Sequence, residues 1–143
     1  MRILGIDYGE KRIGLALSDE LEMTARGLSV IERRSKGKDL EAIAASVSEH
    51  GVGAIVVGYP LRLDGTAGIQ CKKVDRFIAG LRDVVSVPVI AWDETLSTKE
   101  AEGLMREAGV KRKKKRGMVD RIAAAVILQD YLNRKSRRGG GNP

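Results

Sequence analysis

The sequence contains a single cysteine, Cys71, and a single histidine, His50, among its 143 residues. One cysteine cannot form an internal disulfide, and together with one histidine it cannot supply the four ligands of a common zinc site. Any metal ion that the protein binds must therefore be held by oxygen ligands. A chain of this length can bury the core of one domain without such cross-links, and it leaves no room for a second full domain.

Long apolar runs are also missing. No segment approaches the ~20 apolar residues that a membrane span needs. The opening residues, MRILGIDYGEKRIG, are interrupted by the charged Asp7, so they resemble neither a signal peptide nor a span. We therefore expect a cytoplasmic protein that does not associate with membranes.

Aromatic residues make up only 3% of the chain, and Trp92 is the one tryptophan. Basic residues are abundant by contrast, with 26 Lys and Arg against 19 Asp and Glu and a formal charge of +7. This excess favours a polyanionic partner such as nucleic acid. Because few aromatic rings are available to stack on bases, we expect recognition of the backbone rather than of the sequence.

The hydrophobic pattern predicts an α/β fold. Apolar runs predict strands over residues 2–7, 12–18, 24–31, 54–57 and 87–92, and helical spacing predicts helices over 40–51, 68–84, 97–108 and 119–132. The run at 54–57 is apolar throughout, which is typical of a central strand that runs parallel to its neighbour. The order βββαβαβαα predicts an α/β sandwich with a mixed sheet.

Two segments in the C-terminal part of the chain are strongly polar. The basic run within residues 110–117 is expected to separate the last two helices without packing against apolar side chains. Residues 1–135 are expected to form the domain, and residues 136–143 a disordered basic and Gly-rich tail.

Four acidic residues occupy positions that suggest chemistry. Asp7 ends an apolar strand, where a carboxylate is costly to bury unless it is paired or binds metal. Asp93 and Glu94 follow another strand, and Asp120 lies at the start of the last apolar helix. Carboxylates that converge without His or Cys suit Mg²⁺ or Mn²⁺. Each acid alone also has an ordinary explanation, as a turn residue, a helix cap or part of a solvated loop.

Two groups of basic residues flank these acids and could contact phosphates. Lys11 and Arg12 follow Gly9 in a turn directly after Asp7, although Gly9 could simply shape a hairpin. The run before Asp120 could equally be a solvated charged segment. Its candidate phosphate-binding residues are Lys113, Lys114, Lys115 and Arg116.

Four segments in this order resemble a known family. They are GIDYGEKRIGLALSD at 5–19, IVVGYPLRLDG at 55–65, WDETLST at 92–98 and RGMVDRIAAAVILQDYL at 116–132. Together they are similar to the bacterial pre-16S rRNA nuclease family, YqgF or RuvX, whose members are in places described as Holliday junction resolvases. The likeness extends over nearly the whole chain.

The resemblance implies a ribonuclease-H-like three-layer fold, in which helices flank a mixed five-stranded sheet. It also implies a metal-dependent nuclease that matures the 5′ end of 16S rRNA, with catalytic acids at Asp7, Glu94 and Asp120. Asp93 remains a candidate fourth metal ligand. The chain departs from the family pattern at Thr95, where an arginine is usual, and at Tyr59, where leucine is usual. The change at Thr95 removes a cation that could contact phosphate.

Three other functions are compatible with parts of this pattern. A Holliday junction resolvase would need a homodimer with two sites, whereas an rRNA nuclease could be a monomer or a homodimer. A non-catalytic RNA-binding factor could assemble with pre-ribosomal particles. An actin-like ATPase shares an Ile-Asp-x-Gly hairpin, but it needs two such domains and this chain is too short.

Overall fold

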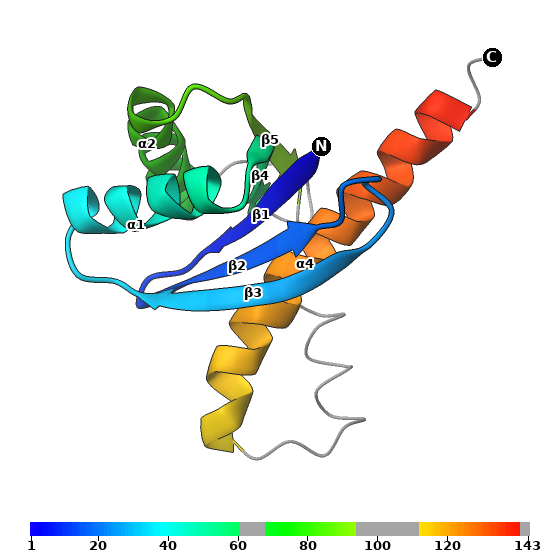
Figure 1. Cartoon of the computed structure of the whole chain (residues 1–143). Helices are drawn as coiled ribbons and strands as arrows, with labels where there is room; N and C mark the ends of the chain where they lie inside the picture. The colour runs from blue at the N-terminus through cyan, green and yellow to red at the C-terminus, as the bar shows by residue number, and fades with distance from the viewer. Residues whose placement is uncertain (61–67, 94–111, 141–143) are drawn as a thin grey trace.

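The computed structural model of the chain describes residues 1–60, 68–93 and 112–140, with side chains described in these ranges except at 112–120 and 136–140. Five strands and three helices lie in these ranges (Figure 1). In chain order they are β1 (Arg2–Tyr8), β2 (Arg12–Ser18), β3 (Ala25–Glu32), α1 (Lys36–Glu49), β4 (Val52–Tyr59), α2 (Ile69–Val84), β5 (Val89–Asp93) and α4 (Arg112–Gly140).

The five strands form one mixed sheet in the order β3-β2-β1-β4-β5. The pairs β1–β2 and β2–β3 are antiparallel, whereas β1–β4 and β4–β5 are parallel. The predicted α/β class with a mixed sheet is confirmed. The strand predicted at 54–57 lies between two parallel neighbours, as expected. β5 is an edge strand that begins directly after Pro88, which suits a residue without a backbone N–H.

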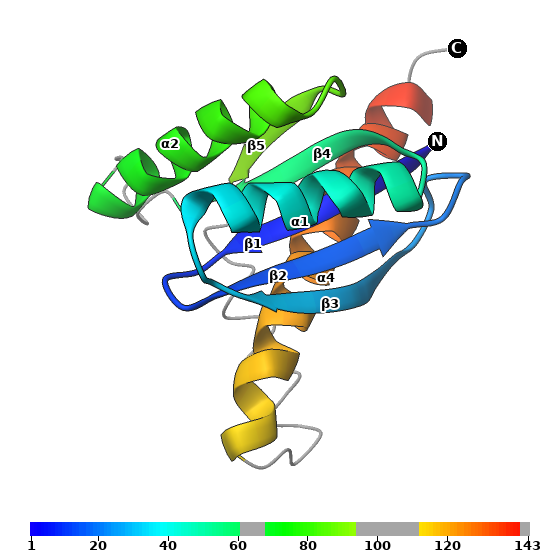
Figure 2. The same ribbon diagram turned by 60° about the vertical axis from the view of Figure 1, so that its left-hand side comes forward.

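The helices and the sheet form three layers, with the sheet in the middle. Helices α1 and α2 lie on one face and α4 crosses the other (Figures 1 and 2). On the first face, α1 and α2 pack Ile43, Phe77 and Leu81 against large strand residues such as Leu4 and Ile6. On the second face, α4 packs against smaller strand residues. This second cluster contains Ile3, Ala16, Ala54, Val56, Ala124, Ile127, Leu128 and Leu132.

Gly5 allows α4 to approach the sheet closely. A Cβ atom added at Gly5 would lie 2.7 Å from Cβ of Leu128 and 3.1 Å from the carbonyl oxygen of Ala124. Both distances are shorter than ordinary van der Waals contact, so no larger residue fits unless α4 moves. The absence of a side chain in β1 thus sets the depth of α4 on the sheet.

The ends of the helices differ from the expectations. Helix α1 begins at Lys36, where the Ser35 side chain accepts a hydrogen bond from the N–H of Lys38 at 3.2 Å. Helix α4 begins at Arg112, so it includes most of the basic run that was expected to separate two helices. Lys and Arg are good helix formers, and their charge does not prevent a helix that projects beyond the sheet.

Helix α4 also continues to Gly140, so it contains residues 136–140 of the segment expected to be a disordered tail. The predicted helix at 97–108 lies outside the described residues. Within the described ranges, no helix combines the length and apolar character needed to cross a membrane.

Candidate active site

One edge of the sheet collects the carboxyl ends of four strands. Because β1, β4 and β5 are parallel and β3 runs in the same direction, all four end on the same side. Asp7 and Tyr8 end β1, Tyr59 ends β4 and Asp93 ends β5. In open α/β sheets, ligands bind at the carboxyl ends of parallel strands. This edge is therefore the candidate active site.

Asp7 lies half-buried on the face that α4 covers, because side chains alternate along β1 and Ile3 and Gly5 contact α4. Its partner on β2 is Gly14. On the other side, Gly58 follows Val57, the residue of β4 that pairs with Ile6. The two strands beside Asp7 thus contribute no side chain at this level, and the carboxylate stands between two glycines.

The position of Asp120 follows from the direction of α4. Ala124 and Leu128 lie over Gly5, Arg121 lies beside Gly27, and Gln129 bonds Ala25. Helix α4 therefore runs opposite to β1 and β3, and its earlier residues lie toward the carboxyl ends of these strands. Asp120 precedes Ala124 by one helical turn, on the side of Asp7. Its helical backbone is described, but its side chain is not.

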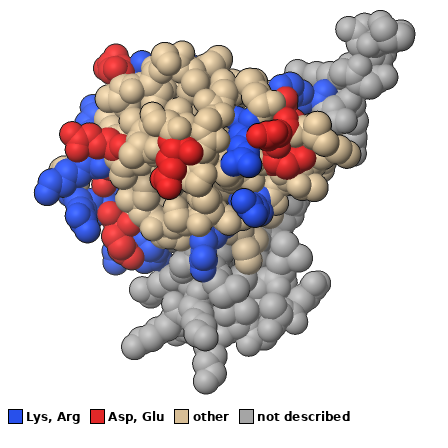
Figure 3. Space-filling view, viewed as in Figure 1, with Lys and Arg blue, Asp and Glu red and all other residues tan. Residues whose placement is uncertain are grey.

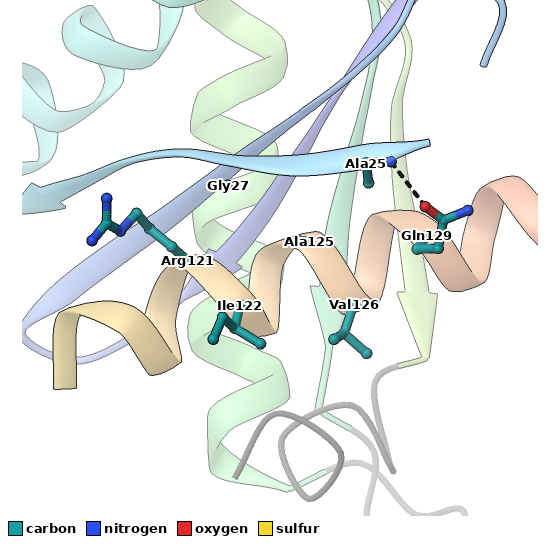
Figure 4. Close-up of a pocket in the computed structure, with 7 residues that line it drawn as sticks. All are labelled: Ala25, Gly27, Arg121, Ile122, Ala125, Val126 and Gln129. Carbon is teal, nitrogen blue, oxygen red and sulfur yellow. Dashed lines mark hydrogen bonds between the residues drawn. The ribbon is translucent and has the colours of Figure 1, made fainter. Parts of the chain in front are cut away.

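Two adjacent polar residues hold α4 in this register. The Gln129 side chain accepts a hydrogen bond from the Ala25 N–H at 2.8 Å (Figure 4) and donates one to the Met23 carbonyl at 3.0 Å. Asp130 accepts a hydrogen bond from Nε1 of Trp92 at 2.8 Å. These contacts tie α4 to β3 and β5, the two edge strands of the sheet.

A groove of about 490 Å³ lies between β3 and α4. In Figure 4, Arg121 and Gln129 lie at opposite ends of the helical segment that lines it. Sequence reasoning did not single out Gln129 or Asp130. A pair of polar residues inside an otherwise apolar helix was the available signal, since polar groups at such positions need partners.

Asp93 does not lie on the same face as Asp7. Trp92 packs against the α4 cluster, so the side chain of the next residue, Asp93, leaves the strand on the opposite face of the sheet. Asp93 is exposed and pairs in register with Tyr59, which packs against the α1 and α2 side of the core. Strand alternation thus places these two predicted metal ligands on opposite faces of the sheet. Glu94 lies outside the described residues.

Tyr59 is also unsuited to act as a base. Burial and a 3.2 Å hydrogen bond from its hydroxyl to Oδ2 of Asp75 raise the pKa of Tyr59 to about 12. The phenol therefore stays protonated at neutral pH, and it is directed toward α2. Among the described side chains, no three His, Cys, Asp or Glu residues are grouped closely enough to hold a metal ion.

The predicted phosphate-binding residues fall into two places. Lys11 is exposed in the turn between β1 and β2, and Arg12 is the first residue of β2. The Gly9 N–H closes this turn on the Arg12 carbonyl at 2.9 Å, and a Cβ at Gly9 would lie 2.6 Å from the same oxygen. Glycine is therefore required there. Lys113, Lys114, Lys115 and Arg116 lie in the first turns of α4, where side chains are not described.

Comparison with known proteins identifies the family. A family model described as "RuvX: Holliday junction resolvase" matches residues 1–134. The chain belongs to the RuvX family. A relative from Syntrophus aciditrophicus (strain SB) is 57% identical over 133 residues, covering 93% of this chain and 89% of the relative. A second, from Halothermothrix orenii, is 46% identical over 98% of this chain and 100% of its own length. Both relatives carry the name "Putative pre-16S rRNA nuclease".

Solved structures share the RuvX fold at low sequence identity. The RuvC protein of T. thermophilus, solved in complex with a Holliday junction substrate, superposes with a TM-score of 0.63 at 20% identity. That match covers 97% of this chain and 96% of RuvC. The Holliday junction resolvase of fowlpox virus has a TM-score of 0.56 at 14% identity, covering 94% and 99% of the two chains.

These findings confirm three predictions. The family is the one that the four sequence segments resemble, and the ribonuclease-H-like fold that it implies is present. Membership of the RuvX family also confirms the reaction class, which is that of a nuclease.

Proposed function

We propose that this RuvX-family chain is a divalent-metal-dependent nuclease that processes the 5′ end of pre-16S rRNA. The observation that carries the proposal is the position of Asp7. This carboxylate ends a central strand between two glycines, on the face where the first half of α4 approaches. Neither flanking strand places a side chain beside the acid at this level, which suits a carboxylate that binds an ion.

The residues available at this edge fit Mg²⁺ or Mn²⁺. We propose that Asp7, Glu94 and Asp120 hold the ion. Asp93 is the weakest candidate ligand, because its side chain leaves β5 on the opposite face of the sheet. These are oxygen donors, which hard divalent ions prefer. A bound ion would supply Lewis-acid activation of water and neutralise charge on the scissile phosphate. The basic residues at 11, 12 and 113–116 would attract and orient the backbone.

The names of the close relatives support pre-16S rRNA as the substrate. Such a substrate would be met in the cytoplasm, free or within pre-ribosomal particles. A second substrate, a four-way DNA junction, is supported by the description of the family model. Junction cleavage requires a homodimer that presents two sites to two strands, whereas rRNA processing does not.

The experiment is a cleavage assay on two substrates, a pre-16S rRNA fragment and a four-way DNA junction. Each is incubated with Mg²⁺, Mn²⁺ or EDTA, and the wild type is compared with Asp7→Asn. We expect metal-dependent cleavage of the rRNA fragment and a loss of roughly 10³-fold in Asp7→Asn, since an ion at a phosphoryl centre contributes several kcal/mol. Circular dichroism serves as the control for folding.

Cleavage of the junction but not of the rRNA would replace the substrate and retain the chemistry. Cleavage that continues in EDTA, or that survives in Asp7→Asn, would contradict the metal site. Binding of the rRNA without cleavage in any ion would favour a non-catalytic assembly factor.

A further inference from the structure

A second candidate binding site lies on the opposite face of the sheet from Asp7. A cleft of about 500 Å³ opens between the first turns of α1, the side of α2 and the end of β1. Four of its lining residues are cations, namely Arg33, Lys36, Lys73 and Arg76. In Figure 3, several Lys and Arg side chains lie on the left of the molecule, with Asp and Glu side chains among them. Neither the family match nor the proposed catalytic acids account for this cluster.

Two of the four cations are already committed to the fold. Arg33 lies 3.8 Å from the buried Asp39 carboxylate and donates hydrogen bonds to the carbonyls of Gly9 and Glu10. Lys73 forms an ion pair with Glu10 at 3.4 Å. These contacts fix the turn between β1 and β2 against α1 and α2. They also occupy the two acidic residues of the cleft.

The other two cations, Lys36 and Arg76, are exposed and form no ion pair with any described residue. The stem of Lys36 lies against α2, where its Cε would be 3.1 Å from a Cβ added at Gly80. The aliphatic part of this side chain thus lies beside α2. Lys36 is also the first residue of α1, so the positive end of the helix dipole adds to its charge. The cleft thus presents uncompensated positive charge.

The aromatic residues of the cleft are not open to a base. The rings of Tyr8 and Phe77 stack on each other with centroids 4.3 Å apart. The Arg33 guanidinium lies over the Tyr8 ring at 4.7 Å from its centroid. Because Tyr8 is already stacked in this way, a ligand would be held by charge and not by base stacking. This favours a sequence-independent contact with phosphates.

The cleft and the candidate active site lie at the same end of β1, on opposite faces of the sheet. Tyr8 follows Asp7 on β1, and Glu10 lies in the turn that carries Lys11. A strand held at the edge near Asp7 would cross this turn before it reaches Lys36 and Arg76.

We propose that this cleft binds the phosphate backbone of a single-stranded nucleic acid that extends past the catalytic edge, with Lys36 and Arg76 as the contacting residues. The inference deepens the proposed function, because it assumes that the ligand is nucleic acid. It concerns binding and not cleavage, so the two proposals can fail separately.

The test measures binding of a fluorescently labelled single-stranded RNA to the full chain in EDTA across a range of salt concentrations. The variant is Lys36→Gln combined with Arg76→Gln. The matched control is Arg26→Gln combined with Lys38→Gln, which removes the same charge from exposed residues that do not line the cleft. We expect the cleft variant to bind roughly tenfold more weakly at low salt. Its plot of log affinity against log salt should be shallower by about 1.4, which is two phosphate contacts on a single strand.

The proposal is overturned if the cleft variant binds as tightly as the wild type, or if the control pair weakens binding to the same extent. The second result would mean that only the net charge matters. Arg76→Gln alone should show about half of the change in slope. This single variant keeps the proposal testable if the double variant does not fold. Asp7→Asn keeps the cleft and should bind at least as tightly as the wild type. A failure of cleavage would therefore leave this result interpretable.

Discussion

The two faces of the sheet are built from different kinds of residue beside the same edge. Large side chains, such as Leu4, Ile6 and Phe77, fill the face under α1 and α2. The face under α4 carries glycine or alanine at several positions, including Gly5 and Ala16. The first face is held together by apolar bulk, and the second by the close approach of one helix.

This difference extends to the end of β1, where consecutive residues serve the two faces. Asp7 lies on the α4 face between two glycines, and Tyr8 lies in the basic cleft of the other face. Consecutive side chains of a strand point to opposite faces of the sheet. The end of β1 can therefore supply an acid to the site on one face and a lining residue to the cleft on the other. The comparison predicts that chemistry depends on the α4 face and that binding depends on both.

The sharpest test of this comparison uses two neighbouring acids. The proposal assigns Glu94 to the metal site on the α4 face, whereas Asp93 starts on the other face beside Tyr59. We therefore expect Glu94→Gln to lower the cleavage rate by roughly 10³-fold and Asp93→Asn to lower it by less than tenfold. Single-turnover cleavage rates at saturating metal measure both. Equal losses of rate in the two variants would mean that Asp93 and Glu94 contribute equally to the metal site, whichever face of the sheet each one starts from.

Gly5→Val should disturb the α4 face by direct steric conflict. The new side chain would meet Leu128 and the carbonyl of Ala124, so we expect a loss of about 1–3 kcal/mol in unfolding free energy. Displacement of α4 should also reduce cleavage by roughly 10²-fold, because small misplacements of catalytic groups are costly. Urea unfolding and cleavage rates provide the two measurements.

The matched control for this variant is Gly37→Ala on the other face. No heavy atom lies within 4 Å of a Cβ added at Gly37, and the residue belongs to α1. Alanine should therefore stabilise the protein by about 0.5–1 kcal/mol without changing cleavage. A stable Gly5→Val variant with normal activity would show that the depth of α4 is unimportant.

The strands and the first two helices could be predicted because their hydrophobic periodicity is strong. The continuous apolar run at 54–57 and the spacing of Val74, Phe77 and Leu81 depend only on local burial. The start of α4 could not be predicted, because a basic segment forms a helix or a solvated loop equally well until its neighbours are known. Helix propensity and charge repulsion oppose each other there.

The candidate site was only partly predictable for a different reason. Asp7 is conspicuous as an acid at the end of an apolar strand. The face on which Asp93 lies depends on the register of β5 with β4, which is a long-range property. The same holds for the basic cleft, since Lys36 and Arg76 come from different helices and meet only in the folded chain. Neither arrangement leaves a pattern in the local sequence.

Gln129→Ala should weaken the attachment of α4 to β3 without changing the packing of the apolar core. The variant removes the hydrogen bonds to Ala25 and Met23, so we expect a loss of about 1–2 kcal/mol in unfolding free energy. The effect should appear as faster amide exchange at Ala25 than in the wild type. An unchanged exchange rate at Ala25 would mean that this contact does not hold the helix to β3.

The smallest expected effect concerns an ion pair between α4 and the turn that precedes β3. Nζ of Lys135 lies 2.6 Å from Oε1 of Glu22, and this hydrogen bond lowers the pKa of Glu22 below its ordinary value of 4.5. The folded chain therefore binds fewer protons at Glu22 than the unfolded chain does in this range. The resulting stability is present above pH 4.5 and is lost as the pH falls through the lowered pKa. The same bond raises the pKa of Lys135, so its contribution is lost only as the pH rises above about 10.5.

Glu22→Gln should accordingly cost no more than about 1 kcal/mol at neutral pH, because the pair is partly exposed. The difference from the wild type should vanish in acid and shrink in high salt. Thermal unfolding between pH 3 and 7 measures it, with Glu41→Gln, an exposed acid on α1, as the control. A difference that persists in acid would mean that Glu22 stabilises the protein through packing. In that case side-chain contacts, and not the ion pair, would hold this end of α4 to the turn before β3.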